Sequence, residues 1–205
     1  MTEANDRLPK SYFKAHPLDE LSFARFSFFQ MAELKLGVAS EIIFDEQISM
    51  LLSQERKDQI TAENERIMKL QTAEEIIDAL RKEREILCRD SIVQRALELE
   101  DAVLPLLLRR YQTNSVDFFI EGAAQIIARA DRKYSETLFA DYSLIRASYA
   151  RAQACLVFAA QDMTQTIPLL VQEVDRLRQM KNREHKSDLS QAPLLALYVL
   201  NDQPY

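Results

Sequence analysis

Glycine is almost missing from this sequence: Gly37 and Gly122 are the only two in 205 residues. Loops that cradle phosphate groups need several glycines, because the backbone must approach the phosphate closely. The sequence therefore excludes a P-loop, a dinucleotide-binding fingerprint and a kinase glycine-rich loop. Sheets and tight hairpins also use glycine at turns with positive φ. The scarcity of glycine thus favours an all-α chain.

Residues that bind metals or act as catalytic bases are equally scarce. The chain has two cysteines, Cys88 and Cys155, and two histidines, His16 and His185. None of them stands at the spacing of a zinc site, and no Glu-x-x-His pair suggests a di-iron bundle. We expect free, buried thiols, no metal and no cofactor. Neither histidine has a Ser or Cys partner in the sequence that suggests nucleophilic catalysis, so we predict that the protein is not an enzyme.

Long apolar runs and a basic charge balance are missing too. No apolar run reaches the ~18–20 residues of a membrane span, and the polar start MTEANDRLPK lacks the core of a signal peptide. We therefore expect a cytoplasmic protein with no membrane contact. The formal net charge is −6, with 14 Lys+Arg against 20 Asp+Glu in residues 1–100 and 12 against 12 in residues 101–205. This balance argues against general nucleic-acid binding, which uses a basic face.

The chain divides into an arm and one helical domain. Residues 1–20 are predicted to be an arm, because two prolines interrupt any helix there. Residues 21–205 are predicted to form a single all-helical domain, in which 21–70 supply N-terminal helices that cap repeats over 72–200. The aromatic-rich segment 21–36 fits a helix, although its partial alternation of apolar and polar residues also fits a strand.

Two capping boxes mark expected helix starts. Thr72 and Glu75 have the spacing at which each side chain bonds the other's backbone N–H. Ser91 and Gln94 repeat that spacing and predict a break near residues 89–90, with a new helix after it.

Residues 102–131 show the pattern that decides the fold. Residues 102–111 place their apolar side chains on one helical face, with Pro105 in the first turn. Asn114 or Ser115 is expected to cap the next helix. In that helix Gly122 and the alanines after it allow a neighbouring helix to approach closely. These residues predict a helical hairpin.

The hairpin pattern recurs further along the chain. Residues 135–146 and 148–161 are predicted to form a second pair, and the latter is apolar nearly all round, which is typical of a central helix. A clean amphipathic helix is predicted over 164–180, and the last helix is expected to start near Pro193. The three pairs are spaced by roughly 30 residues, which is typical of stacked helical repeats.

Over about residues 74–200 the chain resembles the HEAT/armadillo-like helical repeat proteins. The residues that carry the resemblance are Val103–Leu107 before the turn, Asp117 after it, and Ala123, Ala124 and Ile127 in the second helix. The resemblance implies a short right-handed stack of antiparallel helical hairpins, an α–α superhelix. The sequence departs from the family pattern because Glu121 stands where an arginine is often found, and because its spacing is shorter than the usual ~40 residues. An irregular helical bundle without repeats is the alternative.

Stacked hairpins leave an extended surface that commonly binds another macromolecule. We therefore expect a non-enzymatic interaction module, a scaffold for a protein or peptide partner. The resemblance also offers a second function, because one group of DNA glycosylases that act on alkylated purines has a HEAT-like stack. The basic residues that could form a strip for DNA are Arg109, Arg110, Arg129, Arg132, Lys133, Arg146 and Arg151. Of these, Arg109, Arg110, Arg146 and Arg151 are the candidates for contact with a partner.

Two observations argue against the nucleic-acid alternative: the pI is about 5.1, and the chain has no tryptophan for stacking on bases. A third alternative is a self-associating structural protein, a homo-oligomer. The last helix either caps the stack or, if Leu195, Tyr198 and Val199 are exposed, forms a subunit interface. The aromatic-rich N-terminal helix raises the same possibility of self-association.

Overall fold

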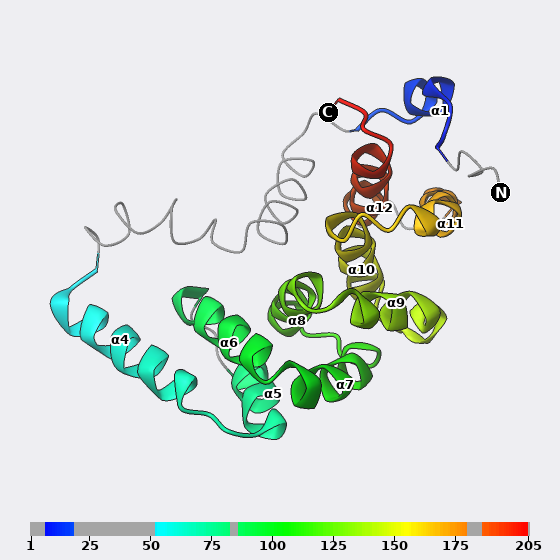
Figure 1. The fold of residues 1–205 in the computed structure, drawn as a ribbon. Coiled ribbons are helices and arrows are strands. Elements are labelled where there is room, and N and C mark those ends of the chain that lie inside the picture. Colours follow the sequence, from blue (N-terminus) through cyan, green and yellow to red (C-terminus); the bar gives the residue numbers. More distant parts are fainter. Residues whose placement is uncertain (1–6, 19–51, 83–85, 180–185, 205) are drawn as a thin grey trace.

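A computed structural model describes residues 7–18, 52–82, 86–179 and 186–204 (Figure 1). These residues form helices and contain no strand, so the predicted all-α class is confirmed. The helices are α1 (Lys10–Ala15), α4 (Gln54–Met68), α5 (Ala73–Lys82), α6 (Ile86–Glu98), α7 (Glu100–Tyr111), α8 (Asp117–Arg129), α9 (Arg132–Ala140), α10 (Ser148–Ala160), α11 (Ile167–Gln179) and α12 (Lys186–Leu200), with short 3-10 helices η1 (Tyr142–Leu144) and η2 (Thr164–Thr166).

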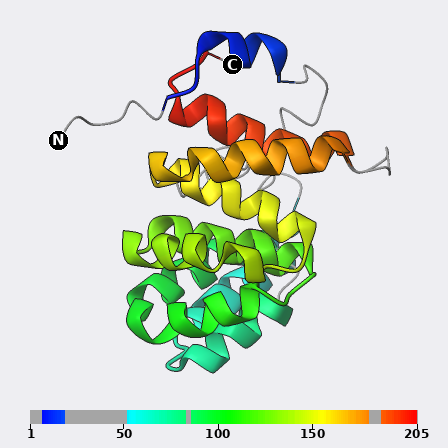
Figure 2. The same ribbon diagram turned by 90° about the vertical axis from the view of Figure 1, so that its right-hand side faces the viewer.

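The helices from α4 onward form two rows (Figure 1). In one row, here called the B row, α4, α6, α8, α10 and α12 contact one another in that order. In the other, the A row, α5 contacts α7 and α7 contacts α9, and each A-row helix packs against the B-row helix that follows it in the chain. Figure 2 shows the pairs stacked in chain order. The right-handed, HEAT-like form of this stack stays a prediction.

Hydrogen bonds between adjacent pairs repeat at a nearly constant separation along the chain. The Tyr134 hydroxyl donates to Asp101 across 33 residues, at 2.8 Å. Gln161 Nε2 donates to the carbonyl oxygen of Ala128, also across 33 residues, at 2.6 Å. Asp131 donates its backbone N–H to Glu100 across 31 residues. Each separation spans one helical pair, in agreement with the spacing expected from the sequence.

The B row supplies the centre of the core. All residues from 152 to 159 in α10 are buried, which confirms that the apolar helix expected over 148–161 is central. In α8 every residue from 119 to 128 except Glu121 is buried as well. Helices covered on all sides have no polar face of their own, so their stability depends on the neighbouring pairs.

A buried ion pair crosses the B row. Arg89 Nη2 of α6 lies 2.9 Å from Glu121 Oε2 of α8, and their side chains are 7% and 24% exposed. Tyr149 of α10 donates its hydroxyl to the other oxygen of Glu121 at 2.7 Å. The Arg89 guanidinium also lies over the Phe118 ring, 4.3 Å from its centroid. Three successive B-row helices are thus joined at one point.

Gly122 of α8 faces Leu80 of α5, where the two helices pack against each other. A Cβ atom at this position would lie 2.5 Å from Cδ1 of Leu80, a side chain that is fully buried. Such a distance is too short for a carbon–carbon contact, so any side chain at residue 122 must displace Leu80. The close helix approach predicted at Gly122 is therefore present in the structure.

One of the two predicted capping boxes forms. The backbone N–H of Glu75 donates to Thr72 Oγ1 at 3.3 Å, and the backbone N–H of Thr72 donates to Glu75 Oε2 at 3.0 Å. The second prediction is wrong, because α6 runs without a break through Arg89 and Ser91. Ser91 Oγ instead donates to Asn64 Oδ1 of α4 at 2.9 Å. A partner on the neighbouring helix has replaced the local cap.

The expected positions of two prolines are also wrong. Pro105 lies in the second turn of α7, since that helix starts at Glu100, and its ring is exposed. Pro193 is the eighth residue of α12, which starts at Lys186 and includes residues expected in a charged loop. Tertiary packing holds α12 together, because all residues from 191 to 198 are buried. The free energy gained by burying this helix exceeds the cost of the backbone hydrogen bond that proline removes.

Two helix starts differ in detail from the predictions. Neither Asn114 nor Ser115 caps α8: Val116 takes the N-cap position, and Asn114 Oδ1 accepts its backbone N–H at 2.8 Å to form the turn. The helix expected over 135–146 starts earlier, at Arg132, because Asp131 caps it by accepting from the backbone N–H of Lys133. It ends at Ala140 and is followed by η1.

The N-terminal segment lies against the last helix of the stack. Helix α1 is found beside α12 in both Figures 1 and 2. The expected helix or strand over 21–36, and most of the expected cap over 21–70, lie outside the described residues. Within the cap, α4 is mostly exposed along its length and packs against α6 through the buried Ile67.

The close approach of α8 to α5 generates the first prediction. Gly122→Leu should lower the free energy of unfolding by about 1–3 kcal/mol, because the new side chain must displace the buried Leu80. Thermal and urea unfolding followed by circular dichroism measure the loss. Ala140→Leu, at an exposed position of α9, is the control and should be close to neutral. A melting temperature that Gly122→Leu leaves unchanged would contradict the close packing.

Candidate functional site

The four arginines predicted to contact a partner come from two adjoining turns. Arg109 and Arg110 are in the last turn of α7. Arg146 lies between η1 and α10, and Arg151 lies in the first turn of α10. The backbone N–H of Arg146 donates to the carbonyl oxygen of Gln112 at 3.0 Å, which holds the two turns together. We call this region, residues 109–117 and 140–148, the turn edge.

Three of these arginines are exposed and have no carboxylate partner among the described residues. Arg109, Arg110 and Arg146 are exposed, and none forms an ion pair within the part of the chain that the structure describes. Arg109 Nε donates only to the carbonyl oxygen of Pro105, at 3.3 Å. The hydrogen bond and charge of Lys82 lower the pKa of Asp78, and the charges of Arg81 and Arg110 lower it further. These guanidinium groups keep most of their donors free for a partner.

Arg151 has a different role from the other three. It is half-buried, its Nε donates to the carbonyl oxygen of Ile145 at 2.8 Å, and its guanidinium lies 5.7 Å from the ring centroid of Tyr142. It therefore fixes the turn before α10. The structure brings Arg109, Arg110 and Arg146 to one edge and uses Arg151 within the fold.

The turn edge also carries exposed apolar side chains that the sequence did not single out. Val116 is 36% exposed and Leu144 is 55% exposed, and these are the exposed large apolar residues of the described chain. Val116 follows the turn from α7, and Leu144 lies in η1. Two aliphatic side chains therefore share one edge with three free arginines. In the sequence Leu144 stands beside Ile145, which is buried, and apolar periodicity does not distinguish the exposed member of the two from the core residue.

The turn edge has acidic residues as well. Asp141 accepts from Gln112 Nε2 at 3.0 Å, so its carboxylate is engaged in holding the two turns together. Asp117 is exposed in the first turn of α8, where the helix dipole favours a negative charge. The surface is mixed in charge, with its arginines at the two helix ends.

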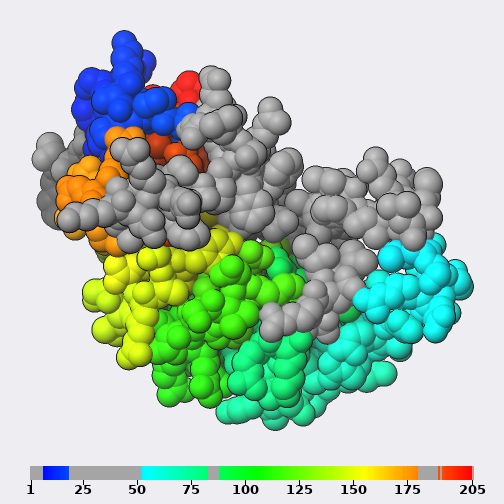
Figure 3. Space-filling model, turned by 180° about the vertical axis from the view of Figure 1, so that it is seen from behind, coloured from blue at the N-terminus to red at the C-terminus, as the bar shows by residue number. Residues whose placement is uncertain are grey.

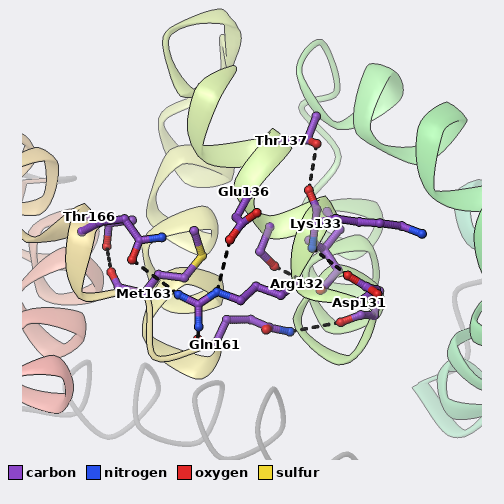
Figure 4. A network of polar contacts seen from close by, with 12 residues as sticks. Asp131, Arg132, Lys133, Glu136, Thr137, Gln161, Met163 and Thr166 are labelled. Atoms are coloured by element: carbon purple, nitrogen blue, oxygen red, sulfur yellow. Dashed lines mark hydrogen bonds and ion pairs between the residues drawn. The ribbon is translucent and has the colours of Figure 1, made fainter.

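Charges at the start of α7 and the start of α9 pair with one another. Lys133 Nζ of α9 lies 3.0 Å from Asp101 Oδ1 of α7. Within α9, Arg132 Nε lies 3.4 Å from Glu136 Oε1 (Figure 4). The hydrogen bonds from Lys133 and Tyr134 hold the pKa of Asp101 below its usual range. The pair of Lys133 and Asp101 joins two neighbouring helical pairs, and the pair of Arg132 and Glu136 lies within α9. The arginines of the turn edge differ from both.

The thiol of Cys155 is the strongest candidate nucleophile in the core, and its surroundings suppress its reactivity. Both cysteines are free and buried, as predicted. Cys155 Sγ lies 3.6 Å from the Tyr142 hydroxyl. Burial raises the pKa of Cys155 to about 12, so its thiol is neutral at physiological pH. A neutral, enclosed thiol is a poor nucleophile.

Comparison with known proteins adds no family to this description: no family model, no curated protein and no solved structure matches the chain. Among the described residues, no group of three or more His, Cys, Asp or Glu side chains is placed to hold a metal ion. None of the helices in those residues is both long and apolar enough to cross a membrane.

The contrast between Arg151 and the other arginines can be measured. Arg109→Ala, Arg110→Ala and Arg146→Ala should each change the free energy of unfolding by no more than about 0.5 kcal/mol, since these side chains are exposed. Arg151→Ala should cost about 1–2 kcal/mol, because it leaves the carbonyl of Ile145 without its donor. Urea unfolding of the four variants checks this. Equal losses for all four would contradict the distinction.

The state of Cys155 gives a separate prediction. Its neutral, enclosed thiol should resist iodoacetamide at pH 8 in the native protein and should react once the protein is unfolded in urea, where its pKa returns to its usual range. Mass spectrometry of the labelled peptide measures both rates. Native labelling as fast as labelling of the unfolded protein would show that the thiol is accessible.

Proposed function

We propose that this protein is a helical-repeat interaction module that binds a protein or peptide partner at its turn edge. We infer that the partner presents an acidic segment with at least one aliphatic side chain. The observation that carries the proposal is that three exposed arginines, which form no ion pair with any described residue, lie on one edge with the exposed Val116 and Leu144. In the proposal the function is non-enzymatic, and the stack serves as a scaffold that presents the edge.

The chemistry of the edge supports a protein partner. Arginine is enriched at protein interfaces, where its planar guanidinium binds carboxylates through two hydrogen bonds. Free arginines at two adjoining helix ends favour approach of an acidic segment, and charge complementarity of this kind sets specificity and association rate. The two aliphatic residues supply apolar surface that is removed from water on binding, which adds a hydrophobic contribution to the affinity.

The rigidity of the stack also supports the proposal. The backbone hydrogen bond from Arg146 to Gln112 fixes the two turns relative to each other. A preorganised surface loses less conformational entropy on binding than a mobile loop does. The arginines can therefore contribute to affinity without a cost for ordering the backbone.

A nucleic-acid partner is the competing function. The same three arginines could contact phosphates. Against this, Asp117 is exposed on the same edge and the chain carries a net charge of −6. Such charges repel the continuous phosphate chain of a nucleic acid more than they repel a short acidic peptide.

The proposal predicts the outcome of a peptide-display selection with the full-length chain as bait. Selected peptides should be rich in Asp and Glu and contain Leu, Ile or Val. Their affinity should fall at least about tenfold for the variant Arg109→Glu/Arg110→Glu/Arg146→Glu, because each reversal replaces an attraction by a repulsion. Fluorescence anisotropy with one labelled peptide measures this change.

The matched control is Lys10→Glu/Lys14→Glu/Lys69→Glu, which changes the net charge equally at exposed positions outside the turn edge. It should retain binding. Peptides that bind the arginine variant as tightly as the wild type would overturn the proposal. Salt-dependent binding of a labelled DNA, retained by the control and lost in the arginine variant, would assign the edge to nucleic acid.

A further inference from the structure

The end of α12 holds the N-terminal segment of the chain through main-chain groups. The Tyr198 hydroxyl lies within hydrogen-bonding distance of the carbonyl oxygens of Phe13, at 3.2 Å, and His16, at 3.1 Å. The Asn201 side chain accepts the backbone N–H of Leu8 at 2.7 Å. Two side chains, Tyr198 of α12 and Asn201 just after it, thus contact three backbone groups of residues 7–16. These residues are the part of the predicted arm over 1–20 that packs on the stack, and they are hereafter called the arm.

One aromatic side chain anchors the arm. Phe13 is 6% exposed, and its ring packs edge-on against the ring of Tyr198 with the centroids 4.8 Å apart. An ion pair between Arg7 and Asp202, at 2.7 Å, joins the other end of the arm, although both side chains are more than half exposed. An exposed pair contributes little to affinity, so Phe13 and the main-chain hydrogen bonds carry the contact.

This arrangement has the features of a peptide-binding site. The receptor consists of Tyr198, Asn201 and Asp202, which we call the arm site. Main-chain hydrogen bonds supply affinity and a buried side chain supplies specificity, as in other complexes of short peptides. The helical part of the arm has six residues, which is too short for a stable isolated helix. The conformation of the arm therefore depends on the arm site.

The arm packs on the surface of the last helix that was expected to mediate self-association. Leu195 and Tyr198 are only 2% and 7% exposed, so the interface expected from exposed residues of the last helix is not available on this surface. Phe13 of the same chain occupies the position against Tyr198. Any copy that docks on this part of α12 has to bring an equivalent of the arm.

We propose that the arm site accepts the arm of a second copy of this chain, so that the protein forms an arm-exchanged dimer. The arm makes the same contacts whether the arm site belongs to its own chain or to a second copy. Exchange therefore changes only which chain the arm is covalently connected to. Residues 19–51 join the arm to the rest of the chain and number 33, a contour length of roughly 110 Å. The closed monomer predominates in dilute solution, and the dimer forms as concentration rises.

The test pairs two complementary variants of the full-length chain. Phe13→Asp removes the anchor of the arm and keeps the arm site. Tyr198→Ala removes the receptor and keeps the arm. Size-exclusion chromatography with light scattering should find each variant monomeric by itself. An equimolar mixture should give a 1:1 heterodimer at high concentration, because the intact arm of one copy fits the intact site of the other.

The outcomes are decisive in either direction. A heterodimer that appears only in the mixture, with twice the mass of one chain, supports arm exchange. A mixture that stays monomeric at the highest attainable concentration overturns it, and so does dimerisation of each variant alone to the same extent. If Tyr198→Ala does not fold by circular dichroism, Tyr198→Phe/Asn201→Ala replaces it, since it removes the bonds to the arm and keeps the packed ring.

The inference is independent of the proposed function. The arm site lies at the end of the stack on α12, whereas the turn edge lies at α7 and η1. Loss of the heterodimer therefore leaves peptide binding at the arginines untouched, and loss of peptide binding leaves the arm exchange untouched.

Discussion

The stack depends on a buried charge that needs a partner one helical pair away. Arg89 of α6 is 7% exposed, and its guanidinium is held by Glu121 of α8, which in turn accepts from Tyr149 of α10. A charge in an apolar interior is costly unless it is paired and hydrogen-bonded, so the three helices cannot slide past one another without breaking this contact. The residue next to Glu121 is Gly122, whose missing side chain lets α8 approach Leu80 of α5. Glu121, whose ion pair fixes the position of α6 relative to α8, and Gly122, which lets α8 pack closely on α5, are thus adjacent residues of α8.

Fixed register between helical pairs has a consequence for the surface. When neighbouring pairs stack with constant register, the end of α7 comes to lie beside η1, and the arginines of two turns share one edge. At the other end of α7 the corresponding charges pair with one another and bind the units together. The same repeated architecture therefore produces one edge whose charges serve the fold and one whose charges face solvent. We assign partner binding to the second edge for that reason.

The helical class and much of the element order could be predicted from the sequence, because apolar periodicity and the Thr72 capping box are local signals. The errors also have a common cause. Ser91 bonds to a neighbouring helix, and Pro193 is carried by a helix buried on all sides, so contacts between pairs outweighed local preference. The site was predicted in part. The four arginines could be selected from the sequence. The hydrogen bond of Arg151 and the exposure of Leu144 could not be predicted, because they depend on how neighbouring helical pairs pack.

The most direct test of this account is a double-mutant cycle on Arg89 and Glu121, measured as the free energy of unfolding of Arg89→Met, Glu121→Gln and the double variant. Because the two side chains are partners across the B row, the account predicts a coupling energy on the order of 1–3 kcal/mol, with the double variant more stable than the sum of the single losses implies. Additive losses within about 0.5 kcal/mol would contradict it. They would show that the ion pair does not hold the helical pairs in register.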